Sequence, residues 1–252
     1  MPNLSKAVVL AGMSRRSFAI ATVISVLTLG IPLTGCSNPL ADAHYNNART
    51  EFNQGNYEDA IKLLDKAIAL SEKPEYYGDR GNTKISLGNF EDAIKDLDKS
   101  IEINPEFAYA YYNRAIAKNA LEDIEGAMID YNNAIKYDPK SEVAYLNRGN
   151  LKEEQGLYRD AIEDYNKAIE INPDDVKAIN NRGISKLKLE LPEEALGDFN
   201  QAAEIDPEYE LIYKNRGISK ALLGDMDGAC NDWDRAEELG VELLEEWGSF
   251  CQ

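Results

Sequence analysis

Apolar and small residues recur through positions 41–239 at spacings of three and four, the spacing that places side chains on one face of an α-helix. Between 158 and 171 these positions are held by Ala161, Ile162, Tyr165, Ala168 and Ile169. Gly156 precedes this segment and Pro173 follows it, and both residue types interrupt helices. The pattern therefore predicts short amphipathic helices separated by tight turns.

The pattern returns every 34 residues, so that equivalent residues form columns. The arginine column comprises Arg80, Arg114, Arg148, Arg182 and Arg216. The alanine column, whose first step is 33 residues, comprises Ala60, Ala93, Ala127, Ala161, Ala195 and Ala229. Each period holds two predicted helices, so we expect six helix pairs that bury their apolar faces against one another.

Small residues occupy the positions at which the two helices of a pair must approach. On the first helices they are Gly81, Ala115, Gly149, Gly183 and Gly217, and on the second helices they are the alanine column. A larger side chain would push the helices apart and destabilise the pair. Aromatic residues such as Tyr165 and Trp233 are expected to fill the remaining space, as core and not as a cofactor site.

Each arginine of the column precedes an aspartate by 16 residues: Asp96, Asp130, Asp164, Asp198 and Asp232. A lysine also follows each arginine by four residues. The first unit has neither arginine nor aspartate, because Asn47 and Leu63 stand in their places, and Glu51 replaces the lysine. This joint loss predicts an ion pair between helices, and either cation could meet the aspartate.

The period and these columns resemble the tetratricopeptide repeat over residues 41–239. The resemblance implies an all-α fold, a right-handed α-solenoid of six helix–turn–helix repeats. The first unit departs from the pattern, as expected of a terminal repeat with one face in solvent. Residues 240–252 are predicted to form a capping helix, because Leu243, Leu244, Trp247 and Phe250 would share one face of it.

The resemblance also implies that the first helices line a concave groove that binds proteins or extended peptides. Candidate groove residues are Asn113, Asn147, Asn181, Asn215, Tyr112, Asn150, Lys177 and Lys214, with Tyr109 on the same face. An asparagine amide both donates and accepts hydrogen bonds, so a ladder of amides could pair with any peptide main chain. We expect Asn147 and Asn181 to face the groove without packing. The alternative is that the asparagines only hydrate a helix face.

The first 35 residues have the anatomy of an export signal. A basic start, with Lys6, Arg15 and Arg16, precedes an uncharged apolar run at 18–33. The following Leu-Thr-Gly-Cys resembles a bacterial lipoprotein box, which implies cleavage before Cys36, acylation of its thiol and a linker at 36–40. The protein is then expected on a bacterial membrane, facing the periplasm or the cell exterior. Arg15 and Arg16 fit either general or twin-arginine export.

Acidic residues outnumber basic ones, 45 against 27, which gives a net charge of −18. Without the leader and its three basic residues the charge is 24 − 45 = −21. Such a surface repels nucleic acid, which we do not expect as a partner, and favours cationic partners. The alternative is a surface whose charge serves only solubility.

Motifs for catalysis, cofactors or metals are not found. His44 is the single histidine, and no CxxC, HExxH, GxGxxG or GxxxxGK[ST] string occurs. The sequence therefore predicts a non-catalytic scaffold that binds proteins or peptides, is anchored by lipid and holds no cofactor or metal. A structural assembly factor for an envelope complex is the alternative, and a hydrolase with two carboxylates is a remote one.

Cys230 and Cys251 are the two thiols that remain if Cys36 is acylated. Export would place them in an oxidising compartment, where a disulfide between them would persist. Against this, Cys230 shares a column with Ile61, Ile94, Met128, Ile162 and Leu196, where a free cysteine would serve as a small apolar residue. The sequence leaves both alternatives open.

Overall fold

The computed structural model of the chain describes residues 38–242 and residue 251. The chain divides into two units, residues 1–39 and residues 40–252. The predicted export signal, Cys36 and the apolar face of the predicted capping helix lie outside the described residues. Among the residues that are described, the regular secondary structure is entirely α-helical.

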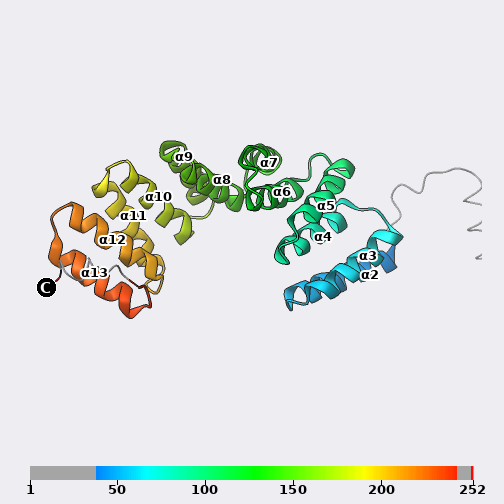
Figure 1. The fold of residues 1–252 in the computed structure, drawn as a ribbon, viewed down its shortest axis with the longest axis horizontal. Coiled ribbons are helices and arrows are strands. Elements are labelled where there is room, and N and C mark those ends of the chain that lie inside the picture. Colours follow the sequence, from blue (N-terminus) through cyan, green and yellow to red (C-terminus); the bar gives the residue numbers. More distant parts are fainter. Residues whose placement is uncertain (1–37, 243–250, 252) are drawn as a thin grey trace, which may run out of the picture. The chain divides into compact units, whose positions relative to one another are not determined.

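Twelve helices follow one another in six pairs within the described residues (Figure 1). They are α2 (Pro39–Asn53), α3 (Tyr57–Leu70), α4 (Pro74–Ser86), α5 (Phe90–Ile103), α6 (Ala108–Ala120), α7 (Ile124–Tyr137), α8 (Glu142–Glu154), α9 (Tyr158–Ile171), α10 (Val176–Lys188), α11 (Pro192–Ile205), α12 (Glu210–Leu222) and α13 (Met226–Glu238). The even-numbered helices are the first helices of their repeats. The six helix pairs predicted from the 34-residue period, and the all-α solenoid that the resemblance implied, are confirmed.

The turn inside each repeat requires a backbone conformation that glycine adopts easily. Gly88 and Gly156 have φ of 77° and 74° in this turn. In two repeats Glu122 and Glu190 take the same position with φ of 62° and 61°. A side chain is strained in this left-handed region, so these two turns carry a local cost.

The helices of a pair touch through the small residues that the sequence predicted. A Cβ atom added to Gly149 would lie 2.6 Å from Cε1 of Tyr165, and one added to Gly183 would lie 2.7 Å from Cε1 of Phe199. The alanine column is fully buried. The aromatic rings of the second helices therefore pack directly on the backbone of the first helices, which confirms their expected place in the core.

A buried aspartate joins the two helices of each repeat from the second to the sixth. In the third repeat, Nε and Nη2 of Arg114 donate to the two carboxylate oxygens of Asp130 at 2.8 and 2.6 Å. Lys118 Nζ lies 2.7 Å from the same carboxylate. The sequence left open which cation meets the aspartate, and the structure shows that both do.

The arginines also connect successive repeats. Nη1 of Arg114 lies 2.5 Å from Oδ1 of Asp98 on α5, the second helix of the preceding repeat. Nη1 of Arg148 donates to Oδ1 of Asn132 on α7 at 2.7 Å. The complete set of Nη1 acceptors is Asp65, Asp98, Asn132, Asn166 and Asn200. Each arginine thus fixes the distance between its own repeat and the one before it.

Candidate functional site: a pocket on the first three repeats

A pocket of about 420 Å³ lies on the first helices of the first three repeats. Helices α2 and α4 form most of it, with Leu64 of α3 and the start of α6 completing its walls. Four aromatic residues line it: Tyr45, Phe52, Phe107 and Tyr109. The polar lining residues are Arg49, Asn53, Glu75, Asp79, Asn82 and Thr83.

Asp79 lies between two tyrosines of this pocket. Tyr45, on α2, and Tyr109, on α6, lie beside its carboxylate and come from the two neighbouring repeats. Burial raises the pKa of the Asp79 carboxyl above its usual value, and the two tyrosine side chains, which favour the charged form, only partly oppose the shift. A carboxylate with a raised pKa is one whose negative charge is incompletely compensated.

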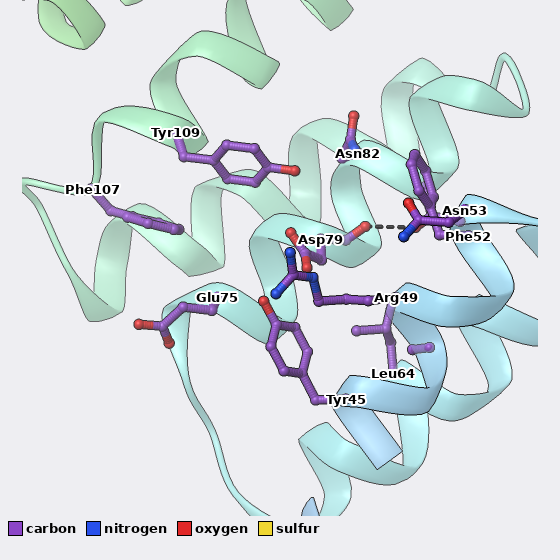
Figure 2. Close-up of a pocket in the computed structure, with 12 residues that line it drawn as sticks. Tyr45, Arg49, Phe52, Asn53, Leu64, Glu75, Asp79, Asn82, Phe107 and Tyr109 are labelled. Carbon is purple, nitrogen blue, oxygen red and sulfur yellow. Dashed lines mark hydrogen bonds between the residues drawn. The ribbon is translucent and has the colours of Figure 1, made fainter. Parts of the chain in front are cut away.

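Arg49 supplies the positive charge of the pocket. Its guanidinium carbon lies 5.9 Å from the centroid of the Tyr45 ring. Its charge lowers the pKa of Asp79, in opposition to burial and to the negative charge of Glu75. Figure 2 shows Arg49 and Tyr45 extending from α2 toward Asp79 on α4. The Arg49 side chain is exposed, so it lies at the mouth of the pocket and not in the core.

The lining residues depart from the repeat pattern. Asp79 stands where the later repeats have the asparagine column. Tyr109 has Val143, Lys177 and Leu211 as its equivalents, and Phe107 has Ser141, Asp175 and Tyr209. These departures give the first three repeats a combination of side chains that the later repeats lack.

The predicted groove residues Asn147, Asn181 and Asn215 bond to the preceding repeat. Asn147 Nδ2 donates to the Tyr112 hydroxyl at 2.8 Å, and Asn181 Nδ2 donates to Asn150 Oδ1 at 2.9 Å. Asn215 Nδ2 donates to Asn180 Oδ1 at 3.0 Å. The three asparagines are half-buried. The expectation that Asn147 and Asn181 are not packed is therefore corrected, because each already holds two first helices together.

Asn113 is the least accessible of the predicted groove residues. It is 3% exposed, and its Nδ2 donates to the backbone oxygen of Tyr109 in its own helix at 2.8 Å. The expectation that this amide is open to a peptide is also corrected.

The predicted lysines lie apart from the pocket residues in the chain. Lys177 is exposed in the first turn of α10. Lys214, on α12, is half-buried, and its backbone oxygen accepts a hydrogen bond from Trp233 Nε1 at 3.3 Å. Neither lysine belongs to the pocket of the first three repeats.

Sequence reasoning found Tyr109 but missed Tyr45, Arg49 and Phe107. It searched for residues that repeat, whereas the pocket is made by residues that do not. The signal available was the break in the asparagine column at Asp79, next to a terminal repeat rich in aromatic residues.

Cys230 of α13 and Cys251 are joined by a disulfide in the structure, with an S–S distance of 2.02 Å and a Cα–Cα distance of 5.6 Å. The bond links the last helix of the sixth repeat to the C-terminal end of the chain. Of the two alternatives left open by the sequence, the structure contains the bonded one.

Residues 38–242 and 251 contain no group of three or more histidine, cysteine or acidic side chains arranged to hold a metal ion. No helix within those residues has the length and apolar character needed to cross a membrane.

Models of the tetratricopeptide repeat match residues 41–73, 108–141 and 143–175, and a TPR repeat model matches residues 81–121. Together these segments cover half of the chain and fall on its first four helix pairs. No curated protein matched the chain by sequence.

Solved structures share the fold. MamA is 25% identical, with a TM-score of 0.58 over 67% of this chain and 93% of MamA. YrrB, described as a TPR protein with an unusual peptide-binding site, is 22% identical, with a TM-score of 0.61 over 70% of this chain and 92% of YrrB. The C-terminal part of a TPR repeat-containing protein from Cytophaga hutchinsonii is 19% identical, with a TM-score of 0.66 over 77% of this chain and 78% of that one.

Proposed function

Because the chain belongs to the tetratricopeptide-repeat family, we propose that it is a non-catalytic scaffold that binds an extended segment of another protein along its first helices. The observation that carries this proposal is the pocket on α2, α4 and α6, which places aromatic rings beside polar groups. Such a combination can anchor one peptide side chain and fix its orientation. The description of YrrB as peptide-binding gives the same fold a precedent for this use.

The binding site in this proposal begins at the pocket and not at the asparagine ladder. In the later repeats, Asn147, Asn181 and Asn215 each donate a hydrogen bond to the preceding repeat. An amide that is already bonded gains little by exchanging its partner for a peptide. The pocket combines open volume with polar and aromatic side chains that the later repeats lack at the equivalent positions.

Site-specific photocrosslinking in native membranes tests this proposal. A photoreactive residue at Asn82, on the pocket wall, should capture a small set of peptides that mass spectrometry can identify. The matched control is the same residue at Glu163, which is exposed on α9, a second helix. Capture of the same peptides at both positions, or of none at Asn82, would refute binding along the first helices.

We further propose that the scaffold is held on a bacterial membrane by acyl chains on Cys36. The support is the Leu-Thr-Gly-Cys sequence directly after the apolar run at 18–33. Two or more acyl chains provide durable anchoring, whereas one chain alone is marginal.

Replacing Cys36 with serine tests the anchor. We expect the Cys36→Ser variant to lose normal processing and the acyl mass, and to leave the membrane fraction after cell fractionation. A Cys251→Ser variant is the control, since it removes a thiol elsewhere and should stay membrane-bound. Normal processing of Cys36→Ser with unchanged membrane association would exclude the anchor.

A further inference from the structure

We propose that the pocket of the first three repeats takes a basic side chain, arginine or lysine, of the bound protein segment, with Asp79 as its counter-ion. This inference rests on the proposed function, and it adds the chemical class of the anchor residue. The rings of Tyr45, Phe107 and Tyr109 would surround the aliphatic part of that side chain.

The charges of the pocket favour a cation. Its lining contains two carboxylates, Asp79 and Glu75, and one guanidinium, Arg49. Arg49 is exposed and can swing into solvent at little cost, whereas Asp79 is half-buried beside Tyr45 and Tyr109. When Arg49 moves away, a half-buried carboxylate beside aromatic rings is left, and this environment binds cations well. The net charge of −18 would also attract a basic segment from a distance.

The fold already holds cations with the same two groups, a tyrosine ring and an aspartate. The guanidinium carbon of Arg80 lies 5.5 Å from the Tyr77 ring while the arginine pairs with Asp96. Arg216 likewise lies 5.1 Å from the Tyr213 ring and pairs with Asp232. In the pocket, Tyr45 and Asp79 offer the same combination at an accessible place.

Arg49 already lies beside this pair of a tyrosine ring and an aspartate. Its guanidinium lies over the Tyr45 ring and its charge reaches Asp79, so it stands where the anchor of a partner would bind. A basic anchor must therefore displace Arg49. Removal of the Arg49 charge should strengthen binding of a cation and weaken binding of an anion, which separates the two kinds of ligand.

Three variants of the full chain make the test. Asp79→Asn removes the counter-ion and installs the residue that the four later repeats carry in this column, so the stack should tolerate it. Arg49→Gln removes the competing charge. Glu163→Gln, on the exposed face of α9, changes the net charge as Asp79→Asn does but lies outside the pocket lining.

The probe is a display library of random dodecapeptides held between fixed flanks, so that no free terminus is offered. Selection on the full chain, purified in detergent, should enrich arginine or lysine at one position. A synthetic peptide from this selection is then titrated by calorimetry. We expect Asp79→Asn to weaken it by roughly tenfold or more, Arg49→Gln to tighten it by a few-fold, and Glu163→Gln to leave it unchanged.

A peptide in which citrulline replaces the selected arginine, or norleucine the selected lysine, should bind as weakly as the parent binds to Asp79→Asn. This comparison and the Arg49→Gln variant decide the question even if Asp79→Asn fails to fold. Selected peptides without a basic anchor, or weaker binding to Arg49→Gln, would overturn the inference and leave peptide binding in place. Failure to select any peptide with either the wild type or Arg49→Gln would overturn both.

Discussion

The Asp130 carboxylate is fully buried, and it lies between two cations, Arg114 and Lys118. A buried carboxylate is tolerated only when such partners satisfy it, and the loss of one member leaves the other charges unpaired. The column of arginines at a 34-residue spacing predicted this pair from sequence. The second bond of Arg114, to Asp98 on the preceding repeat, was not predicted, because it depends on how two repeats are placed and not on the pattern within one.

Replacing Asp130 with alanine should lower the free energy of unfolding by about 3–5 kcal/mol, because Arg114 and Lys118 then lose their shared partner inside the protein. Urea unfolding followed by circular dichroism measures the change. Asp98→Ala is the matched control, since Asp98 binds the same arginine but is 55% exposed in its side chain. It should cost less than about 1 kcal/mol. Equal losses in the two variants would contradict the assigned role of burial.

Replacing both Asn147 and Asn181 with alanine should lower the free energy of unfolding by about 2 kcal/mol, roughly 1 kcal/mol for each hydrogen bond between first helices. The physical reason is the pair of bonds to Tyr112 and Asn150. Thermal melting of the double variant, together with Tyr112→Phe as a variant that removes only one acceptor, measures the effect. A double variant as stable as the wild type would show that these hydrogen bonds do not stabilise the stack and that the asparagines only face solvent.

The short turn between the helices of a repeat sets the shape of each pair. The sequence analysis placed Gly156 at this turn. The structure adds that Glu122 and Glu190 both keep the left-handed backbone of the glycines they replace. The turn propensity of glutamate alone would not predict a left-handed backbone at these positions, because packing of the two flanking helices holds the turn in place.

Glu190→Gly should raise the free energy of unfolding by about 0.5–1 kcal/mol, since relief of the left-handed strain outweighs the extra flexibility of glycine in the unfolded chain. The reciprocal variant, Gly156→Ala, should lower it by a similar amount, because no neighbouring atom lies within 4 Å of the added Cβ and only the backbone is strained. Chemical denaturation of both variants gives the comparison. The same sign of change in the two would show that strain at this turn is not the cause.

At the scale of the whole stack, stability comes from contacts between neighbouring repeats, and the two ends have a neighbour on one side only. The number of repeats and the positions of their helices were predictable, because the alanine column marks all six units and the arginine column marks five of them. The pocket was not, because it joins Tyr45, Asp79 and Tyr109 from three different columns. Only the three-dimensional stacking of repeats brings such residues together.

Reduction of the disulfide between Cys230 and Cys251 should destabilise the C-terminal end by up to about 3 kcal/mol, the chain-entropy value for a loop of this size. Hydrogen exchange should then increase in α13 first, while α6 to α9 keep their protection. A Cys251→Ser variant should behave like the reduced protein without added reductant. Two alkylatable thiols on the exported, unreduced chain, or faster exchange throughout the stack on reduction, would contradict this prediction.

The pocket includes residues of the one repeat that has no arginine–aspartate clamp, since Asn47 and Leu63 stand in place of the pair. An occupant that touches α2, α4 and α6 together would hold this terminal repeat against the next two repeats. Ligand binding and opening of the first repeat then become linked equilibria, in which ligand at ten times its Kd lowers the equilibrium population of the opened repeat by about tenfold. A protease would find its first cleavage site near α2 in the empty protein and would lose it in the loaded one, so the lifetime of the scaffold in the cell would report whether its partner is present.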